Sequence, residues 1–308
     1  MTVKSPSNVA ASIRQRLLNR AKNDHRPFNE LLQYYAMERF LYRLSKSSHA
    51  KRFILKGGLM LRAWNSSEFR PTMDIDVLGK TKNEVANLFA KIKDIIAVEV
   101  PPDGLVFDPD SIRAERITQD ADYEGMRLRF TVVLDSAKVT IQIDVGFGDV
   151  VFPEPQPCTL PTLLDFPQPK LMGYSRESTI AEKFEAMVRH RELNSRMKDF
   201  YDVWLLARQF DFEGNQLREA IRLTFEKRGV PLPDVIIAFS DSFTSDKQVA
   251  WTAFRKRLQQ ETIPESFSEV VAVVDGFLSP LVNAMIAHRP VPGNWSAKGP
   301  WHGYFDAR

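Results

Sequence analysis

Two aspartates separated by one residue, Asp74 and Asp76, have the clearest capacity for chemistry in this sequence. They lie in the run Asp74-Ile75-Asp76-Val77-Leu78, which predicts a β-strand with alternating faces. Side chains two apart on a strand point to the same face, so the two carboxylates repel each other unless a cation lies between them. Mg²⁺ is a hard ion that prefers oxygen ligands. The pair therefore predicts a Mg²⁺ site, and the alternative is a solvent-facing strand with two ordinary acids.

A third carboxylate, Asp144, lies in a segment with the same alternation. From Val139 to Val145 the odd positions are apolar and the even positions are polar, which places Asp144 on the polar face of a strand. If this strand lies beside the one that carries Asp74 and Asp76, three carboxylates meet. Such a set suits two metal ions that activate an attacking hydroxyl and stabilise the charge on a phosphate during nucleotidyl transfer. The predicted metal ligands are Asp74, Asp76 and Asp144.

The run Lys56-Gly57-Gly58 follows the apolar residues 53–55, at a turn from a strand into a short helix. Glycines let the backbone approach a ligand closely, and a helix N-terminus favours a phosphate. The pattern predicts a phosphate-binding turn, and an ordinary tight turn is the alternative.

Two charged residues of the second half, Lys183 and Asp199, are expected to point inward. A helix is predicted from a capping box formed by Thr179 and Glu182, and Lys183 lies beside its apolar face. A lysine there needs an anionic partner, either a nucleoside triphosphate or a structural acid. Asp199 shares a helix face with Val203 and later apolar residues, so it either serves the site, caps a neighbouring helix or pairs with an arginine.

The elements that must position these residues follow from the periodicity of the chain. Helices are predicted over 7–22 and 28–46, and from Thr81 with Glu84 completing a capping box. Strands are predicted at 53–55, 74–78, 105–107, 112–117, 126–134 and 138–145, and a short turn near Asp135 and Ser136 makes the last two a hairpin. The expected class is α+β, a small mixed sheet with helices followed by a helical domain.

The predicted domains follow shifts in composition. Residues 1–50 are expected to form an N-terminal helical cap, and 51–150 the core with the mixed sheet. Six prolines between 151 and 169 argue against a regular helix or a central strand, so 151–175 is predicted to be a linker. Residues 176–288 are expected to be helical and 289–308 to be an irregular tail.

Composition limits the class of protein. A chain of 308 residues with 44% hydrophobic and 26% charged residues suits a globular protein of two domains. The single cysteine, Cys158, excludes a disulfide within the chain. The sequence shows no secretory signal. No apolar run is expected to approach the roughly 20 residues of a membrane span, because Asp275 and Gly276 interrupt the longest run. The expected location is cytoplasmic, without a membrane.

Residues 1–46 contain nine Lys or Arg and three Asp or Glu, an excess that either attracts RNA or is an ordinary solvated surface.

These motifs, taken together, resemble the AbiEii/AbiGii toxin family of the polymerase-β-like nucleotidyltransferase superfamily. Four runs in the family's order carry the resemblance, over residues of about 51–208: Leu55-Lys56-Gly57-Gly58, Arg70-Pro71-Thr72-Met73-Asp74-Ile75-Asp76, Ala181-Glu182-Lys183-Phe184-Glu185-Ala186-Met187 and Arg196-Met197-Lys198-Asp199-Phe200-Tyr201-Asp202.

The resemblance implies a polymerase-β-like core, two Mg²⁺ ions, a nucleoside triphosphate (NTP) and a toxin encoded beside its antitoxin. It implies transfer of a nucleoside monophosphate to RNA, at the 3′ end of tRNA in relatives, which blocks translation. Gly57 and Gly58 would bind phosphates, Lys183 would contact the triphosphate, and Asp199 would be an essential acid. Many relatives have Ser or Thr where this chain has Leu59, so phosphate binding would rely more on the backbone and on Lys56, Arg62 or Lys183.

Three other functions remain open from the sequence. A nucleotidyltransferase of this superfamily can modify an antibiotic or a protein hydroxyl instead of RNA. A protein that only binds nucleotides can keep the same fold. The retention of Asp74, Asp76, Lys183 and Asp199 argues against that last alternative.

Overall fold

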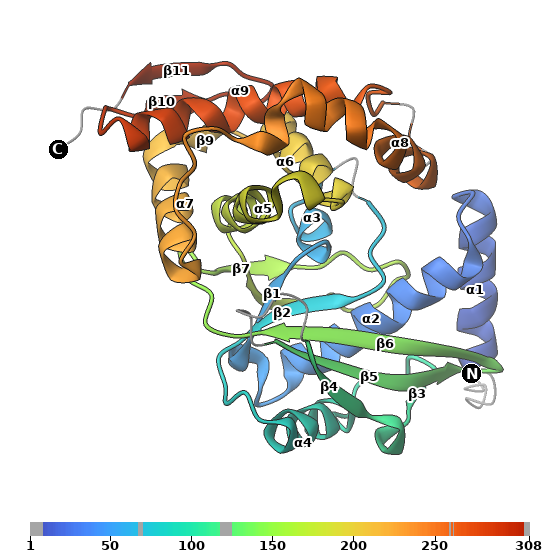
Figure 1. Ribbon diagram of the computed structural model, residues 1–308. Coiled ribbons are helices and arrows are strands. Elements are labelled where there is room, and N and C mark those ends of the chain that lie inside the picture. Colours follow the sequence, from blue (N-terminus) through green and yellow to red (C-terminus); the bar gives the residue numbers. More distant parts are fainter. Residues whose placement is uncertain (1–8, 67–69, 118–124, 259, 261, 305–308) are drawn as a thin grey trace. The chain divides into compact units, whose positions relative to one another are not determined.

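The structure is a computed structural model that describes residues 9–66, 70–117, 125–258, 260 and 262–304. The chain divides into two compact units (Figure 1). Unit 1 comprises Met1–Asn65, Pro71–Gly148 and Gln156–Gly173, and unit 2 comprises Ser66–Arg70, Asp149–Pro155 and Tyr174–Arg308.

Unit 1 is built on a mixed sheet of eight strands in the order β3-β5-β6-β2-β1-β8-β7, with β4 paired to β5. The strands are β1 (Phe53–Lys56), β2 (Ile75–Gly79), β3 (Leu105–Phe107), β4 (Arg113–Ile117), β5 (Gly125–Leu134), β6 (Ala137–Gly146), β7 (Gln156–Thr159) and β8 (Lys170–Gly173). β2 pairs with β6 and β1 with β8 in parallel, and β1 pairs with β2 antiparallel. The predicted hairpin is confirmed, because β5 and β6 pair antiparallel on either side of Asp135, whose φ is 55°.

Four helices accompany this sheet: α1 (Val9–Asn23), α2 (Phe28–Lys46), α3 (Leu59–Ala63) and α4 (Val85–Ile96). Every residue of α2 from Leu31 to Leu44 is buried, as expected of a helix packed on several sides. Ile13 and Leu17 of α1, Leu32 and Tyr35 of α2, and Leu134 of β5 form one apolar cluster. The N-terminal helices therefore share a core with the sheet.

The predicted start of α4 is wrong. The helix begins at Val85 with Glu84 at its N-cap position, and Glu84 makes no side-chain capping bond. The Thr81 hydroxyl accepts a bond from the Asn87 side chain at 3.1 Å, within the turn that leads into the helix.

Unit 2 is mainly helical, as predicted. Its helices are α5 (Arg176–His190), α6 (Met197–Gln209), α7 (Gly214–Arg228), α8 (Asp241–Leu258) and α9 (Phe267–Ile286). Aromatic rings fill its core. The ring centroids of Phe200 and Phe267 lie 5.1 Å apart, and those of Phe184 and Phe225 lie 5.2 Å apart. The predicted capping box at Thr179 is wrong, because α5 begins three residues earlier and the Ser175 hydroxyl accepts from Ser178 N–H.

Two stretches differ from the pattern expected of them. Residues 151–175, marked as a linker by their prolines, contribute β7 and β8 to the sheet of unit 1. Pro157 is accommodated because β7 is the last strand in the order, where one side of the strand has no partner among the described residues. The tail contributes β10 (Pro292–Trp295) and β11 (Trp301–Tyr304), which pair with each other, and β10 pairs with β9 (Phe212–Glu213).

Helix α9 is long and apolar, contrary to the expectation that no segment approaches the length of a membrane span. It has 20 residues and a mean hydropathy of 1.6 in its most apolar window, and it alone among the described helices meets such a criterion. Its buried residues include Phe267, Val274 and Phe277, and it packs against α6 and α8. A core helix of this kind meets the same criterion without a membrane.

Candidate active site

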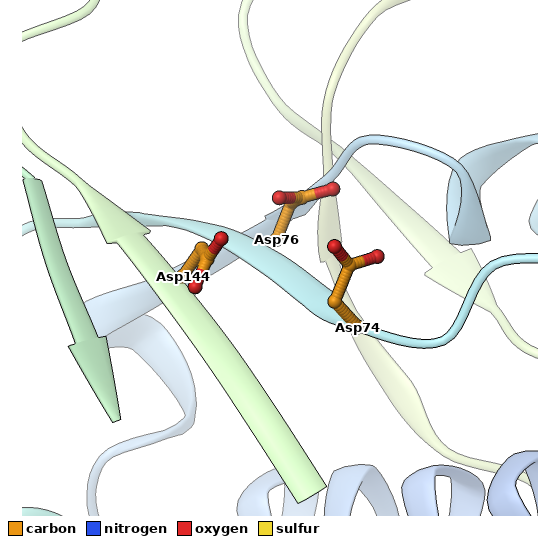
Figure 2. Close-up of side chains that lie close together, drawn as sticks. All are labelled: Asp74, Asp76 and Asp144. Atoms are coloured by element: carbon orange, nitrogen blue, oxygen red, sulfur yellow. The ribbon is translucent and has the colours of Figure 1, made fainter. Parts of the chain in front are cut away.

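The three predicted metal ligands meet in unit 1. Asp76 on β2 and Asp144 on β6 are register partners across a parallel pair of strands, and Asp74 immediately precedes β2. One ligand oxygen from each of Asp74, Asp76 and Asp144 can be chosen so that all three lie within 4.8 Å of one another. Figure 2 shows the three carboxylates gathered beside the two strands. Three oxygen donors at this spacing fit a hard divalent cation.

Two neighbouring side chains orient this cluster. Arg127 on β5 donates from Nε to Asp144 Oδ1 at 2.8 Å and from a terminal nitrogen to Oδ2 at 2.7 Å. The Thr72 hydroxyl donates to Asp74 Oδ1 at 2.7 Å. A bidentate guanidinium fixes the plane of a carboxylate, so Asp144 is held against β5 while Asp74 and Asp76 extend from β2. Asp144 is therefore oriented by a bidentate guanidinium.

The glycine turn lies against Asp76. Lys56 is the register partner of Asp76, and Gly57 follows it with φ of 71°. A Cβ at Gly57 would lie 2.0 Å from Asp76 Oδ2, which no side chain tolerates. Gly58 has ordinary helical angles, with φ of −64°. Of the two glycines, Gly57 is the one whose geometry requires glycine, and the reason is close contact with a predicted metal ligand.

The other predicted phosphate contacts differ in how accessible they are. Leu59 is 1% exposed and belongs to the core. The Arg62 guanidinium lies 4.6 Å from the centroid of the Tyr34 ring, and burial lowers the pKa of Arg62. Lys56 is half-buried beside Asp76. Helix α3 has only five residues, so its dipole contributes little to anion binding. Lys56 and the backbone of the turn are the groups of this segment nearest the carboxylates.

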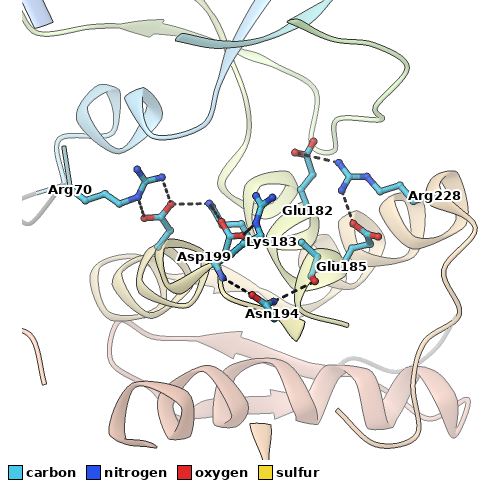
Figure 3. A network of polar contacts seen from close by, with 10 residues as sticks. Arg70, Glu182, Lys183, Glu185, Asn194, Asp199 and Arg228 are labelled. Atoms are coloured by element: carbon cyan, nitrogen blue, oxygen red, sulfur yellow. Dashed lines mark hydrogen bonds and ion pairs between the residues drawn. The ribbon is translucent and has the colours of Figure 1, made fainter. Parts of the chain in front are cut away.

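Lys183 and Asp199 meet in unit 2, where they form a buried ion-pair network (Figure 3). Lys183 Nζ lies 2.8 Å from Asp199 Oδ1 and 2.8 Å from Asp202 Oδ2. Arg196 pairs with Asp199 at 2.5 Å, and Arg70 pairs with Asp202 at 2.8 Å. Both aspartates are almost completely buried, with side chains 0% and 1% exposed. The inward direction predicted for Lys183 and Asp199 is confirmed, and the anionic partners of the lysine are structural acids.

The electrostatics of this network favour the charged forms of Lys183, Asp199 and Asp202. Burial alone would lower the pKa of Lys183, but Asp199 and Asp202 raise it above its ordinary value. Burial alone would raise the pKa of Asp199, but Lys183 and Arg196 hold it well below its usual range. Arg70 and Lys183 do the same for Asp202. The network thus combines three cations, Arg70, Lys183 and Arg196, with two buried carboxylates.

The acids on either side of Lys183 along α5 have a separate partner. Arg228 of α7 lies 3.5 Å from Glu182 and 2.6 Å from Glu185, and it also pairs with Asp149 at 3.2 Å. Figure 3 shows the contacts of Arg228 with the two glutamates beside the Lys183 network. Asp149, which follows two glycines in the sequence, is thus a partner of Arg228 in unit 2.

The predicted site residues therefore fall into two groups. The carboxylates and the glycine turn belong to unit 1, and Lys183 and Asp199 belong to unit 2. The sequence pattern missed Arg127 and Arg70. The contact of Arg127 with Asp144 could have been predicted, because the hairpin turn at Asp135 and Ser136 sets these two residues opposite each other. No local pattern indicated that Arg70 would pair with Asp202, 132 residues away.

Three carboxylates clustered on and beside two adjacent strands, next to a tight glycine turn, define a centre suited to metal-assisted transfer of a phosphorus group. A family model described as the nucleotidyl transferase AbiEii toxin of type IV toxin–antitoxin systems matches residues 39–273. The chain belongs to this family and is a nucleotidyltransferase. Membership implies an NTP substrate, a divalent metal and an antitoxin partner.

Two solved structures from Helicobacter pylori are also similar to the chain. One, described as a candidate nucleotidyltransferase, is 16% identical, with 89% of this chain and 97% of that chain covered and a TM-score of 0.47. The other, JHP933, is 15% identical, with 84% and 97% covered and a TM-score of 0.48. A search of curated proteins finds no match. The assignment rests on the family match and on the site.

Proposed function

We propose that this protein is a cytoplasmic, Mg²⁺-dependent toxin that transfers a nucleoside monophosphate from an NTP to the 3′ end of an RNA, with tRNA as the acceptor. Blocked tRNA ends would stop translation as part of abortive infection, and an antitoxin encoded beside the toxin would restrain it. The observation that carries the proposal is the cluster of Asp74, Asp76 and Asp144, whose ligand oxygens lie within 4.8 Å of one another.

Each predicted residue has a defined task in this proposal. Asp74, Asp76 and Asp144 would hold the divalent cations, which supply positive charge against the triphosphate and the attacking hydroxyl. Gly57, with Gly58 and Lys56, would let the phosphates approach Asp76 closely. Arg127 would keep Asp144 oriented through its two hydrogen bonds of 2.8 and 2.7 Å.

Lys183 would contact the triphosphate, and Asp199 would fix the position of its ammonium group. The network supports this assignment through the hydrogen-bonding capacity of the lysine. Lys183 has three N–H donors and two carboxylate partners, so one donor remains for a ligand.

The test is transfer of label by the purified protein. The protein is incubated with each α-labelled NTP, Mg²⁺ and total RNA, beside an Asp76→Asn variant and an Asp94→Asn variant as a matched control. Asp94 is an exposed carboxylate on α4 outside the cluster. We expect label in tRNA from the wild type and from Asp94→Asn, and a loss of at least about a hundredfold in Asp76→Asn.

Other distributions of label would contradict the proposal. Label in protein, or in an added aminoglycoside, would show a different acceptor. Absence of label from every acceptor, with normal folding, would leave a protein that only binds nucleotides.

A further inference from the structure

An exposed row of cations crosses three neighbouring strands of the sheet in unit 1. The row consists of Lys51, Arg52, Lys80, Lys82 and Lys170, all of which are exposed. We call it the basic edge. None of the five forms an ion pair with any residue in the part of the chain that the structure describes.

Strand register places three of these cations side by side. Phe53 of β1 pairs with Gly79 of β2, and Lys80 N–H donates to Arg52 O at 2.8 Å. On the other side of β1, Ile54 pairs with Met172 of β8, so Lys170 lies level with Arg52. Neighbouring strands are about 4.8 Å apart, so Lys80, Arg52 and Lys170 form a line of about 10 Å across the sheet.

Several cations of the N-terminal helices are buried or paired with acids. Arg39 and Arg43 are buried, with side chains 1% and 8% exposed, and Arg20 and Arg26 pair with acids one helical turn away. Two of these four cations are therefore buried, and the other two are paired with acids nearer the surface. The acids of the segments that adjoin the basic edge include Glu84, Asp94 and Asp165, and Asp94 accepts a bond from His49.

The edge also has a fixed relation to the carboxylate cluster, because β1 joins them. Arg52 lies four residues before Lys56, the register partner of Asp76. At about 3.3 Å per residue, Arg52 and Lys56 are about 13 Å apart along the chain. Stacked nucleotides advance by about 3.4 Å, so roughly four of them span this distance.

We infer that the basic edge binds the phosphate backbone of the acceptor RNA, several nucleotides away from the 3′ end that reacts. This inference rests on the proposed function for the identity of the acceptor. A line of cations that pair with no acid of the described chain matches the evenly spaced charges of a nucleic acid strand and carries no sequence information. The edge gives affinity for long RNA, and the cluster of Asp74, Asp76 and Asp144 acts on its end.

The test is a triple charge reversal, Arg52→Glu, Lys80→Glu and Lys170→Glu. Lys227→Glu, Lys256→Glu and Arg257→Glu form the matched control, with three exposed cations of unit 2 reversed. Binding of purified bacterial tRNA is measured by filter retention without NTP or metal, over a range of salt concentrations. We expect the edge variant to bind at least about tenfold more weakly than the control, with the slope of log K against log salt smaller by about 3.

A second measurement varies the length of the RNA acceptor. Transfer of nucleotide to a dinucleotide acceptor, which is too short to span from the cluster to the edge, should be the same in the edge variant and the wild type. If the edge variant is poorly folded by circular dichroism, the neutral triple Arg52→Gln, Lys80→Gln and Lys170→Gln replaces it, with a smaller loss of the same kind expected.

Equal tRNA binding by the edge variant and the control would overturn the inference. Retained tRNA binding with lost binding of polyglutamate would instead assign the edge to an acidic protein. The two proposals fail separately: a wild type that transfers nucleotide to RNA while edge variants bind normally contradicts only the inference. A wild type that binds tRNA through the edge but transfers nothing contradicts only the proposed function.

Discussion

Gly57 shows how a single residue can be tied to the candidate metal site. It combines a left-handed backbone with direct contact to Asp76, whereas Gly229 has a similar φ of 63° and open space, with no atom within 4 Å, where a Cβ would lie. Comparing substitutions at these two glycines therefore distinguishes the effect of backbone strain from the effect of contact with Asp76.

We expect Gly57→Ala to weaken metal binding, because the new methyl group displaces the Asp76 carboxylate. Both Gly57→Ala and Gly229→Ala should lose about 1 kcal/mol of stability from the positive φ. Only Gly57→Ala should lower Mn²⁺ affinity, by about tenfold or more, measured by the electron paramagnetic resonance signal of free Mn²⁺. Equal Mn²⁺ binding in both variants would mean that Asp76 is not a ligand.

Lys183 is the residue whose role the structure changes most. Its ammonium bridges Asp199 and Asp202, both buried, so it supports the fold as well as being a candidate for triphosphate binding. The depressed pKa values of the two aspartates stabilise the protein above the ordinary carboxyl value of 3.8, and this contribution is lost as pH falls through the folded-state values.

We expect Lys183→Met to lower the free energy of unfolding by about 3 kcal/mol at pH 7, because two buried carboxylates lose a shared cation. Adding Asp199→Asn should recover part of this loss by removing one of the charges. Triphosphate binding, followed with a fluorescent nucleotide analogue, should stay weak in both variants. Lys198→Met, an exposed lysine on the same helix as Asp199, is the control. Recovered nucleotide binding in the double variant would rule out the ammonium as the triphosphate contact.

At the scale of elements, α2 carries a buried carboxylate that holds a loop. Glu38 is 2% exposed, and its Oε2 accepts from Leu163 N–H at 2.9 Å. Burial raises the pKa of Glu38 to about 7, although the Leu163 bond and Arg39 oppose the shift. The folded protein therefore holds a proton on Glu38 that the unfolded chain releases near 4.5.

Because the folded-state pKa of this acid is raised, Glu38 lowers stability as pH rises from 4.5 to about 7, and its effect is constant above that. We expect Glu38→Gln to remove this slope while keeping an acceptor for Leu163 N–H. At pH 8 the variant should exceed the wild type by up to about 3 kcal/mol, and below pH 4.5 the difference should vanish.

Urea unfolding between pH 4 and pH 8 measures this difference, with Glu30→Gln, a half-buried glutamate on the same helix, as the control. Parallel stability curves for the wild type and Glu38→Gln would contradict the prediction.

The elements also show what the sequence could predict. The hairpin of β5 and β6 follows from strict alternation and a two-residue turn, and it correctly places Asp144 on the polar side. The predicted starts of α4 and α5 are wrong. Thr81 and Thr179 are residues of a type that often caps a helix, but their hydroxyls bond to Asn87 and to Ser175 O instead. Several residues at a helix start can supply a hydroxyl, and tertiary packing decides which one does.

At the scale of the whole molecule, the class was predictable but the path of the chain was not. The α+β class followed from periodicity, and the meeting of Asp76 with Asp144 followed once their strands were expected to be neighbours. The sequence did not predict that residues 156–173 return to the sheet. The prolines around β7 argue against a strand, and its partner β8 is only four residues long. The pairing of β8 with β1, more than a hundred residues earlier, depends on contacts that no local window contains.

The tail offers a test of how far the folded unit extends beyond the family match, which ends at residue 273. Trp295 and Trp301 pack on Phe277 of α9, with ring centroids 4.8 and 5.6 Å away. The Trp295 indole N–H donates to Ala207 O at 2.7 Å, which ties the tail to α6. The tail therefore completes the core of unit 2.

We expect Trp295→Ala to lower the stability of the protein by about 3–5 kcal/mol, since it leaves a cavity against Phe277 and removes the hydrogen bond to Ala207 O. Deletion of residues 290–308 should cost more and should expose Phe277 enough to increase binding of an apolar dye. His302→Ala, an exposed change on the same small sheet, should leave the melting temperature unchanged. A tail deletion that melts like the wild type would show that unit 2 folds without these strands. In that case the aromatic contacts to Phe277 would contribute nothing measurable to the core.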